Sequence, residues 1–257
     1  MAESSDSLAR IAELEAQNRD LEVALEQARG EVHQLINLAG HDLQAPLRTV
    51  RMFLDLLLTT QGVGLSPKAR QYIGHCLTAA SHGETLVQGL LAFSRVETSG
   101  GPLVEASLAE LARSALTQVR MDVDAAGGTV DIGALPARKV DVGQVVEVFR
   151  ILFDNAVRYR SSEPPRIVVR AQHREDGWLV VEVEDNAVGI PPAGQAAALE
   201  PFRRVHTGAD IDGTGLGLAI AGRILARHGG ELGLRSEAGV GSTFWFALPP
   251  AQTPGQP

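Results

Sequence analysis

The sequence predicts a multidomain α+β protein: an N-terminal coiled coil leads into a helical hairpin, and an α/β sandwich follows. Three patterns predict this arrangement. Residues 8–40 place apolar side chains at a seven-residue repeat. The helical stretches that follow each have one apolar face, and a short glycine-containing loop joins them. Beyond residue 102, helical patterns mix with β-branched or alternating runs, which is typical of a layered helix-and-sheet domain.

Composition sets the limits of this prediction. The chain has 257 residues, of which 44% are hydrophobic and 21% charged, so it can bury a core. The net charge of −8 argues against a nucleic-acid partner, because non-specific binding to phosphates needs clustered positive charge. The single cysteine, Cys76, excludes an intrachain disulfide and a zinc site built on several cysteines. Without an uncharged run near the ~18 residues of a membrane span, we expect a cytoplasmic chain with no direct membrane span.

The N-terminal repeat predicts a dimerising coiled coil, assigned here to residues 1–30. Its two apolar positions are occupied by Ile11, Asn18, Leu25, Val32 and Ala39, and by Leu14, Leu21, Ala28 and Leu35. Asn18 at the first position favours a two-stranded coil in one register. The alternative is a helix that packs on its own domain.

A helical hairpin is predicted next, over residues 31–97. Leu43, Leu47, Val50, Leu54 and Leu57 continue the apolar stripe, and residues 61–67 form a loop. Ser66 can cap a second helix that begins at Pro67. One hairpin cannot enclose a core, so we expect two copies to pack as a four-helix bundle, which makes the protein a homodimer.

The rest of the chain predicts a hinge, a sandwich and a tail. Residues 98–102 (TSGGP) have the composition of a hinge. Residues 103–250 form the sandwich, with helices near 107–126, 141–160 and 215–228 and strands at 166–172, 178–184, 231–236 and 242–248. The Pro/Gln/Gly-rich tail at 251–257 is expected to be disordered.

His41 is a candidate nucleophile on the first hairpin helix. The apolar stripe is centred on the opposite side of that helix, so His41 faces solvent. A solvated imidazole presents a nucleophilic nitrogen at neutral pH, and the neighbouring Asp42 can orient or deprotonate it. The alternative is an ordinary surface histidine.

Three later segments suit phosphate chemistry. Asn155 offers a hard oxygen ligand to Mg²⁺, and Arg158 shares its helix face. Asp185 ends a strand, where it can accept from an amine such as that of adenine, and Gly189 lets the backbone approach a flat ligand. A glycine series opens a helix and forms an anion site, with Gly213, Gly215 and Gly217. Each segment taken alone also fits a simple turn.

Together these motifs resemble the transmitter of bacterial two-component sensor histidine kinases, which have a HisKA dimerisation domain and a GHKL-type (Bergerat) ATPase domain. The resemblance covers residues 31–249. HDLQAPLR resembles the H box, LFDNAVRYR the N box, DNAVG the G1 box, PFRR the F box and GTGLGL the G2 box. HDLQ-PLR with PFRRVHT further resembles kinase modules attached to phytochrome-like sensors.

The resemblance implies an ATP-dependent histidine kinase with ATP and Mg²⁺ as cofactors. His41 would accept the phosphoryl group beside the acid/base Asp42, and the receiver domain of a response regulator would then take it onto an aspartate. Asn155 would hold Mg²⁺. The implied ATP-binding residues are Asn155, Arg158, Tyr159, Asp185, Gly189, Arg204, Gly213, Gly215, Leu216 and Gly217.

Three residues depart from the family pattern. Ile151 stands where the N box opens with asparagine, and Ala187 replaces the first glycine of the G1 box. Ala45 stands where Thr or Asn positions water for dephosphorylation of the partner. Ile151 leaves open the alternative of a catalytically decayed phosphorelay or scaffold protein with the same fold. Another GHKL ATPase, such as a chaperone or topoisomerase relative, would lack HDLQAPLR on a hairpin helix.

Overall fold

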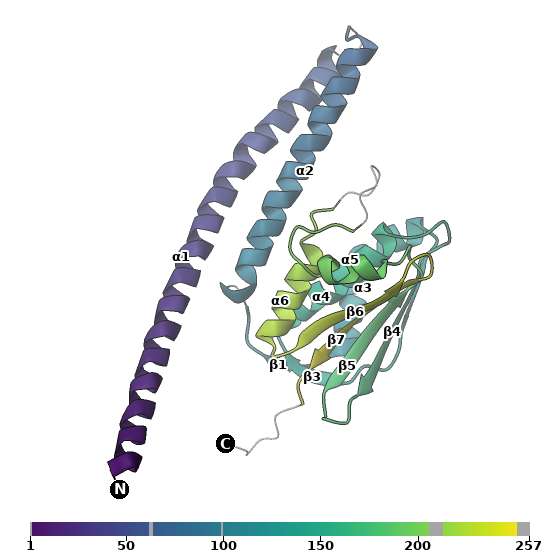
Figure 1. Cartoon of the computed structure of the whole chain (residues 1–257). Coiled ribbons are helices and arrows are strands. Elements are labelled where there is room, and N and C mark those ends of the chain that lie inside the picture. Colours follow the sequence, from purple (N-terminus) through teal and green to yellow (C-terminus); the bar gives the residue numbers. More distant parts are fainter. Residues whose placement is uncertain (1, 62–63, 99, 206–212, 251–257) are drawn as a thin grey trace.

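The chain begins with a long helical hairpin (Figure 1). The structure, a computed structural model, describes residues 2–61, 64–98, 100–205 and 213–250. Helix α1 (Ala2–Gln61) and helix α2 (Pro67–Thr98) lie antiparallel. Ser66 accepts a hydrogen bond from the backbone N–H of Ala69 at 3.2 Å, so the predicted cap is confirmed.

The hairpin buries little of its apolar surface within one chain. Its buried apolar side chains in the described part are on α2, namely Ala80, Val87, Leu91 and Val96. The repeat positions of α1 whose side chains are described are exposed instead, and so are several apolar residues that follow His41 along the helix: Leu14, Leu21, Leu25, Val32, Leu35, Leu43, Val50 and Leu57. The stripe expected to face a partner is therefore uncovered in the single chain.

The C-terminal domain is a two-layer sandwich. Its five-stranded sheet has the order β2-β4-β5-β7-β6, in which β2 and β4 run parallel and the other pairs antiparallel. The strands are β2 (Thr129–Ile132), β4 (Arg166–His173), β5 (Leu179–Asp185), β6 (Glu231–Glu237) and β7 (Gly241–Leu248). A separate antiparallel pair joins β1 (Val104–Ser107) to β3 (Ala137–Val140).

Three helices cover one face of this sheet: α3 (Leu108–Ala125), α4 (Val142–Arg158) and α6 (Gly217–Arg227). They form a continuous core with the sheet, in which Phe149 packs edge-on against Phe246 with ring centroids 5.5 Å apart. A short helix, α5 (Pro192–Ala198), lies near β6. The opposite face of β5 and β7 carries partly exposed residues such as Glu182 and Trp245.

The long predicted elements are all observed, with shifts of a few residues at their ends. The sequence did not predict the strands β1, β2 and β3 or helix α5. The expected tail, 251–257, and residues 206–212, which precede the glycine series, lie outside the described residues.

The sandwich rests on the hairpin through α6 and α2. The guanidinium of Arg223 lies over the ring of Phe93, 4.5 Å from its centroid, and Arg223 Nη2 is 3.3 Å from Nε2 of His33 on α1. Leu216 is fully buried, and a Cβ at Gly89 would lie only 2.7 Å from its Cδ1. The small residue on α2 therefore lets the start of α6 approach closely.

Candidate functional site

A cleft of about 440 Å³ lies between α4, the loop after β5, the start of α6 and the side of α2. Every predicted nucleotide residue except Leu216 lines it: Asn155, Arg158, Tyr159, Asp185, Gly189, Arg204, Gly213, Gly215 and Gly217. Leu216 is buried beside the cleft, against α2. The fold thus gathers three segments that are far apart in the sequence into one concave site of the size that small-molecule ligands occupy.

Asp185 forms the buried end of the cleft. Its Oδ1 accepts hydrogen bonds from the backbone N–H groups of Ala187 and Ser242, at 2.9 and 3.0 Å. Burial raises the pKa of its carboxyl, and the two N–H groups oppose that shift. Both bonds end on Oδ1. No described residue donates a hydrogen bond to Oδ2, so this oxygen can accept from the amine of a ligand.

The loop after Asp185 is held in a conformation that requires glycine. Gly189 has φ +66°, and a Cβ there would lie 1.9 Å from the carbonyl oxygen of Glu237. The loop is fixed by Ile190, whose N–H donates to Ser236 Oγ at 2.7 Å, and by Val188, whose N–H donates to the carbonyl of Tyr159 at 3.0 Å. The wall of the cleft is therefore preformed.

Helix α4 presents polar side chains to the cleft in i, i+3 and i, i+4 pairs. Arg158 donates to Asp154 at 2.7 Å, and Arg150 donates to both oxygens of Glu147 at 2.6 Å. The hydrogen bonds from Arg150 to Glu147 raise the pKa of that arginine. Asn155 lies in the same lining, so charged and amide groups share one side of the site.

Ile151 lies between these polar residues and the core. It is buried yet lines the cleft, and a Cβ at Gly217 would lie 3.2 Å from its Cγ2. The residue that departs from the family pattern therefore packs under the start of α6 and contributes apolar surface where an amide is usual.

The start of α6 exposes backbone donors to the cleft. Its first turn has no side-chain cap, which leaves backbone N–H groups without intrahelical partners beside the cleft. Gly215 has φ +69°, and a Cβ there would lie 2.7 Å from the carbonyl oxygen of Arg203. Gly213 lies against Arg158 and Tyr159, so the glycine loop and the basic residue of α4 meet.

His41 and Asp42 do not line this cleft. The prediction that His41 faces solvent is confirmed, since its side chain is 87% exposed and that of Asp42 is 82% exposed. Nδ1 of His41 lies 3.6 Å from Oδ1 of Asp42. This contact directs Nδ1 toward the carboxylate, so Nε2 lies on the side of the exposed ring away from Asp42.

Sequence reasoning missed several lining residues, and two cases are informative. The first is Ser242, whose position opposite Asp185 in the β5–β7 register was not foreseen. The second is the wall from α2, made of Thr85, Gln88, Gly89 and Ala92. The small and polar stripe on α2 was a usable signal, but the sequence does not tell which domain covers it.

The donor set fits a magnesium ion held mainly by phosphates. No group of three or more His, Cys, Asp or Glu side chains in the described ranges forms a metal cage. Mg²⁺ in phosphate-transfer sites takes one or two protein ligands and completes its shell with phosphates and water. Asn155, in the lining near the α6 start, can supply such a ligand.

Two family models match the chain. The histidine kinase-, DNA gyrase B- and HSP90-like ATPase model matches residues 140–252, and the His Kinase A (phospho-acceptor) domain model matches residues 31–99. A phosphoacceptor domain followed by such an ATPase domain defines the transmitter of a sensor kinase. The chain belongs to the two-component sensor histidine kinases.

Its relatives include phytochrome-type sensors. The phytochrome-like protein Cph1 of Synechocystis sp. is 32% identical over 225 residues, covering 88% of this chain and 30% of that protein. Cyanobacterial phytochrome A of Nostoc sp. is also 32% identical over 225 residues, covering 88% of this chain and 29% of that protein. The chain thus spans less than a third of the length of these relatives.

Solved structures share the fold. A crystal structure of full-length ShkA in complex with AMPPNP matches with a TM-score of 0.62 and 26% identity, covering 86% of this chain and 46% of that chain. None of the helices in the described part of the chain combines the length and apolar character needed to cross a membrane.

Proposed function

We propose that the chain is an ATP-dependent protein histidine kinase that phosphorylates His41 and passes the phosphoryl group to an aspartate of a response regulator. One observation carries the proposal. The same chain holds a preformed cleft lined by Asp185, Asn155 and the uncapped start of α6, and an exposed histidine beside a carboxylate.

The cleft supports ATP as the ligand. Asp185 would accept from the adenine amine, while the glycine-rich start of α6 and Arg158 would hold the phosphates. Asn155 would hold Mg²⁺, which supplies charge neutralisation between the phosphate oxygens when bound. ATP binding is further supported by the ATPase family match and by the nucleotide analogue in the ShkA complex.

At His41 the transfer is a substitution at phosphorus. Nε2 attacks the γ-phosphorus, the bond to the β–γ bridging oxygen breaks, and ADP leaves. Asp42 stabilises the proton on Nδ1 of the ring as positive charge develops. Because His41 lies outside the cleft of its own chain, the cleft must approach a His41 by domain movement or from the partner of a dimer.

The exposed apolar stripe of α1 supports a homodimer. Two hairpins packed on this stripe would form the four-helix bundle, and the exposed surface around His41 would receive the regulator. In this proposal residues 31–97 carry the phosphoacceptor and residues 103–250 bind the nucleotide.

The experiment is incubation with γ-labelled ATP and Mg²⁺, with wild type and His41→Gln side by side. We expect acid-labile, base-stable label on the wild type and none on the variant. Label on both would place the phosphoryl group elsewhere. If neither is labelled and ATP binds normally, the scaffold alternative replaces the kinase.

Ala45 bears on a second activity, the hydrolysis of the phosphorylated regulator. It lies one turn after His41 and offers no side-chain donor to orient a water molecule. We expect slow dephosphorylation of the phosphorylated regulator and a several-fold gain in Ala45→Thr. Rapid dephosphorylation by the wild type, with no gain in the variant, would contradict this.

A further inference from the structure

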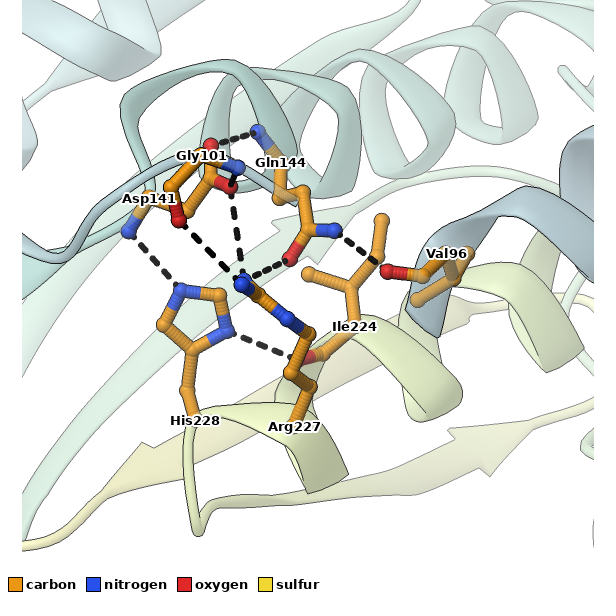
Figure 2. Close-up of polar contacts among 7 residues, drawn as sticks. All are labelled: Val96, Gly101, Asp141, Gln144, Ile224, Arg227 and His228. Atoms are coloured by element: carbon orange, nitrogen blue, oxygen red, sulfur yellow. Dashed lines mark hydrogen bonds and ion pairs between the residues drawn. The ribbon is translucent and has the colours of Figure 1, made fainter. Parts of the chain in front are cut away.

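The segment between the two domains is held by hydrogen bonds, although its composition is that of a hinge. It joins the end of α2 to β1, and its described residues, Gly100 to Pro102, pass beside α4 and α6 (Figure 2). The N–H of Gly101 donates to Asp141 Oδ2 at 2.5 Å, and the carbonyl of Gly101 accepts from Arg227 Nη2 at 3.2 Å. Both backbone groups of Gly101 are therefore bonded to side chains of the sandwich.

Arg227, at the end of α6, connects these contacts. Its Nη1 donates to Gln144 Oε1 at 2.9 Å and lies 3.3 Å from Asp141 Oδ2. Gln144 in turn donates from Nε2 to the carbonyl of Val96, in the last turn of α2, at 2.7 Å. One guanidinium thus links α6, the start of α4, the linker and the end of the hairpin, as Figure 2 shows. Lysine could not replace this planar fork.

The partners of Arg227 are themselves fixed. Asp141 caps α4 by accepting from the N–H of Gln144 at 3.1 Å, and its own N–H donates to Nε2 of His228 at 2.9 Å. Because a backbone N–H only donates, Nε2 must accept, so Nδ1 of His228 carries the proton and donates to the carbonyl of Ile224 at 2.7 Å. Asp141 and His228 are both buried.

The glycine pair of the linker has unequal roles. A Cβ at Gly100 would lie 2.2 Å from Cζ of Arg227 and 2.3 Å from its Nη2, so the guanidinium fits only because residue 100 lacks a side chain. A Cβ at Gly101 would lie 3.5 Å from Asp141 Oδ2, an ordinary contact. Neither glycine has a positive φ, so the backbone accepts alanine at both positions.

We propose that Arg227 is a positioning residue that, with Asp141 and Gln144, clamps the linker and thereby fixes the nucleotide domain (residues 103–250) on the hairpin in the arrangement that presents its cleft to His41 of the partner subunit. This rests on the proposed kinase function. The clamp lies outside the nucleotide cleft and is therefore separable from nucleotide binding. Phosphoryl transfer depends mainly on positioning, so releasing the clamp slows transfer without weakening ATP binding.

The test compares Gly100→Ala with Gly101→Ala in the full chain, together with Arg227→Gln and the double variant Gly100→Ala/Arg227→Gln. Each alanine removes one glycine from the linker, but only the one at position 100 displaces the guanidinium, which is the far end of a flexible side chain. We expect Gly100→Ala and Arg227→Gln each to lower the autophosphorylation kcat by about 10-fold or more. The KM for ATP stays within about twofold, Gly101→Ala behaves like the wild type, and the double variant is no slower than either single variant.

Amide hydrogen exchange at residue 101 provides a readout that does not need kinase activity. We expect the N–H to be protected in the wild type and in Gly101→Ala, and to exchange faster in Gly100→Ala and Arg227→Gln. Unchanged protection at residue 101 would overturn the clamp. An unchanged or raised kcat, or a loss confined to ATP affinity, would overturn the positioning role. Absence of label on the wild type would instead refute the kinase proposal. The hydrogen-exchange rates at residue 101 would then still test whether Arg227 holds the linker.

Discussion

The hairpin and the nucleotide domain differ in where their apolar side chains lie: those of the nucleotide domain are buried in its own core, and many of those of the hairpin are exposed. In the nucleotide domain the sheet and three helices enclose their own core, and Phe246 is 0% exposed. In the hairpin the apolar repeat faces outward, and Leu35 is 65% exposed. A contiguous apolar stripe of this kind is typical of a surface that meets another chain.

The comparison indicates where each part obtains its stability. The nucleotide domain has the size and core of an independently folding unit. The hairpin is expected to depend on association with a second chain, because two antiparallel helices cannot enclose a core. Catalytic competence and dimer formation are therefore expected to respond to different substitutions, and the following predictions test that separation in order of expected effect.

The largest effect is expected from Phe246→Ala. The ring is buried against Phe149, and its removal leaves a cavity that lowers the free energy of unfolding by about 3–5 kcal/mol. Denaturation in urea, followed by tryptophan fluorescence and by sedimentation, measures both domains. We expect the nucleotide domain to unfold early while the chain still sediments as a dimer; loss of the dimer at the same urea concentration would show that the two regions are coupled.

The next effect is expected from Leu35→Glu. A charge on the exposed stripe of α1 would be buried in the dimer, which weakens association by at least about 100-fold in dissociation constant. Analytical ultracentrifugation measures the change, and ATP affinity should stay the same. Met121→Glu is the matched control, because Met121 on α3 is 85% exposed outside the repeat. Equal effects of the two variants would contradict the assignment of the stripe.

Asp185→Asn should reduce ATP affinity by about 10- to 100-fold, since an amide has one oxygen, which cannot accept from both the backbone N–H groups and the adenine amine. It should also stabilise the nucleotide-free protein at neutral pH, raising Tm by about 3 °C. Burial raises the pKa of Asp185, so its ionisation opposes folding: stability is greatest below the ordinary carboxyl pKa and falls as pH rises through the raised value.

Thermal unfolding of wild type and Asp185→Asn across pH checks this sign. The difference in Tm should shrink as the pH falls below the ordinary range of a carboxyl group. A variant that is less stable than the wild type at pH 7 would refute the inferred cost of burying the carboxylate.

The smallest effect is expected from Ile151→Asn. The amide would lie one turn from Asn155 on α4 and offer the oxygen that the family pattern has there. We expect ATP affinity in the presence of Mg²⁺ to rise by about threefold, or ~0.7 kcal/mol, with a lower Tm because a core side chain is lost. Calorimetric titration with and without Mg²⁺ measures the gain, which should vanish when the metal is removed.

Most of the fold could be predicted because its long elements have strong periodicity. Helix α4 and strands β5 and β7 show the expected apolar spacing, and their observed ends lie close to those predicted. Strands β1, β2 and β3 have four residues each, too few for a period-two pattern to stand out. Their pairing depends on neighbours that are distant in the sequence.

The site was predictable wherever one short segment carries the chemistry. Asp185, Gly189 and the glycines before α6 are local motifs, and the structure brings them into one cleft. The wall from α2 and the clamp around Arg227 were not predictable, because each joins residues from different domains. A glycine pair indicates flexibility by composition, whereas Gly100 is required here by the approach of a guanidinium that is more than a hundred positions away.

The fixed tautomer of His228 gives the molecule a built-in spectroscopic label. A buried imidazole that accepts at Nε2 and donates from Nδ1 has nitrogen resonances distinct from those of a ring in exchange with water. Nitrogen NMR of a histidine-labelled sample would therefore report, at a single ring, whether the contact between the end of α6 and the start of α4, beside the linker, is intact during turnover. No external probe need be attached, and the long exposed helix of the hairpin can be left unmodified.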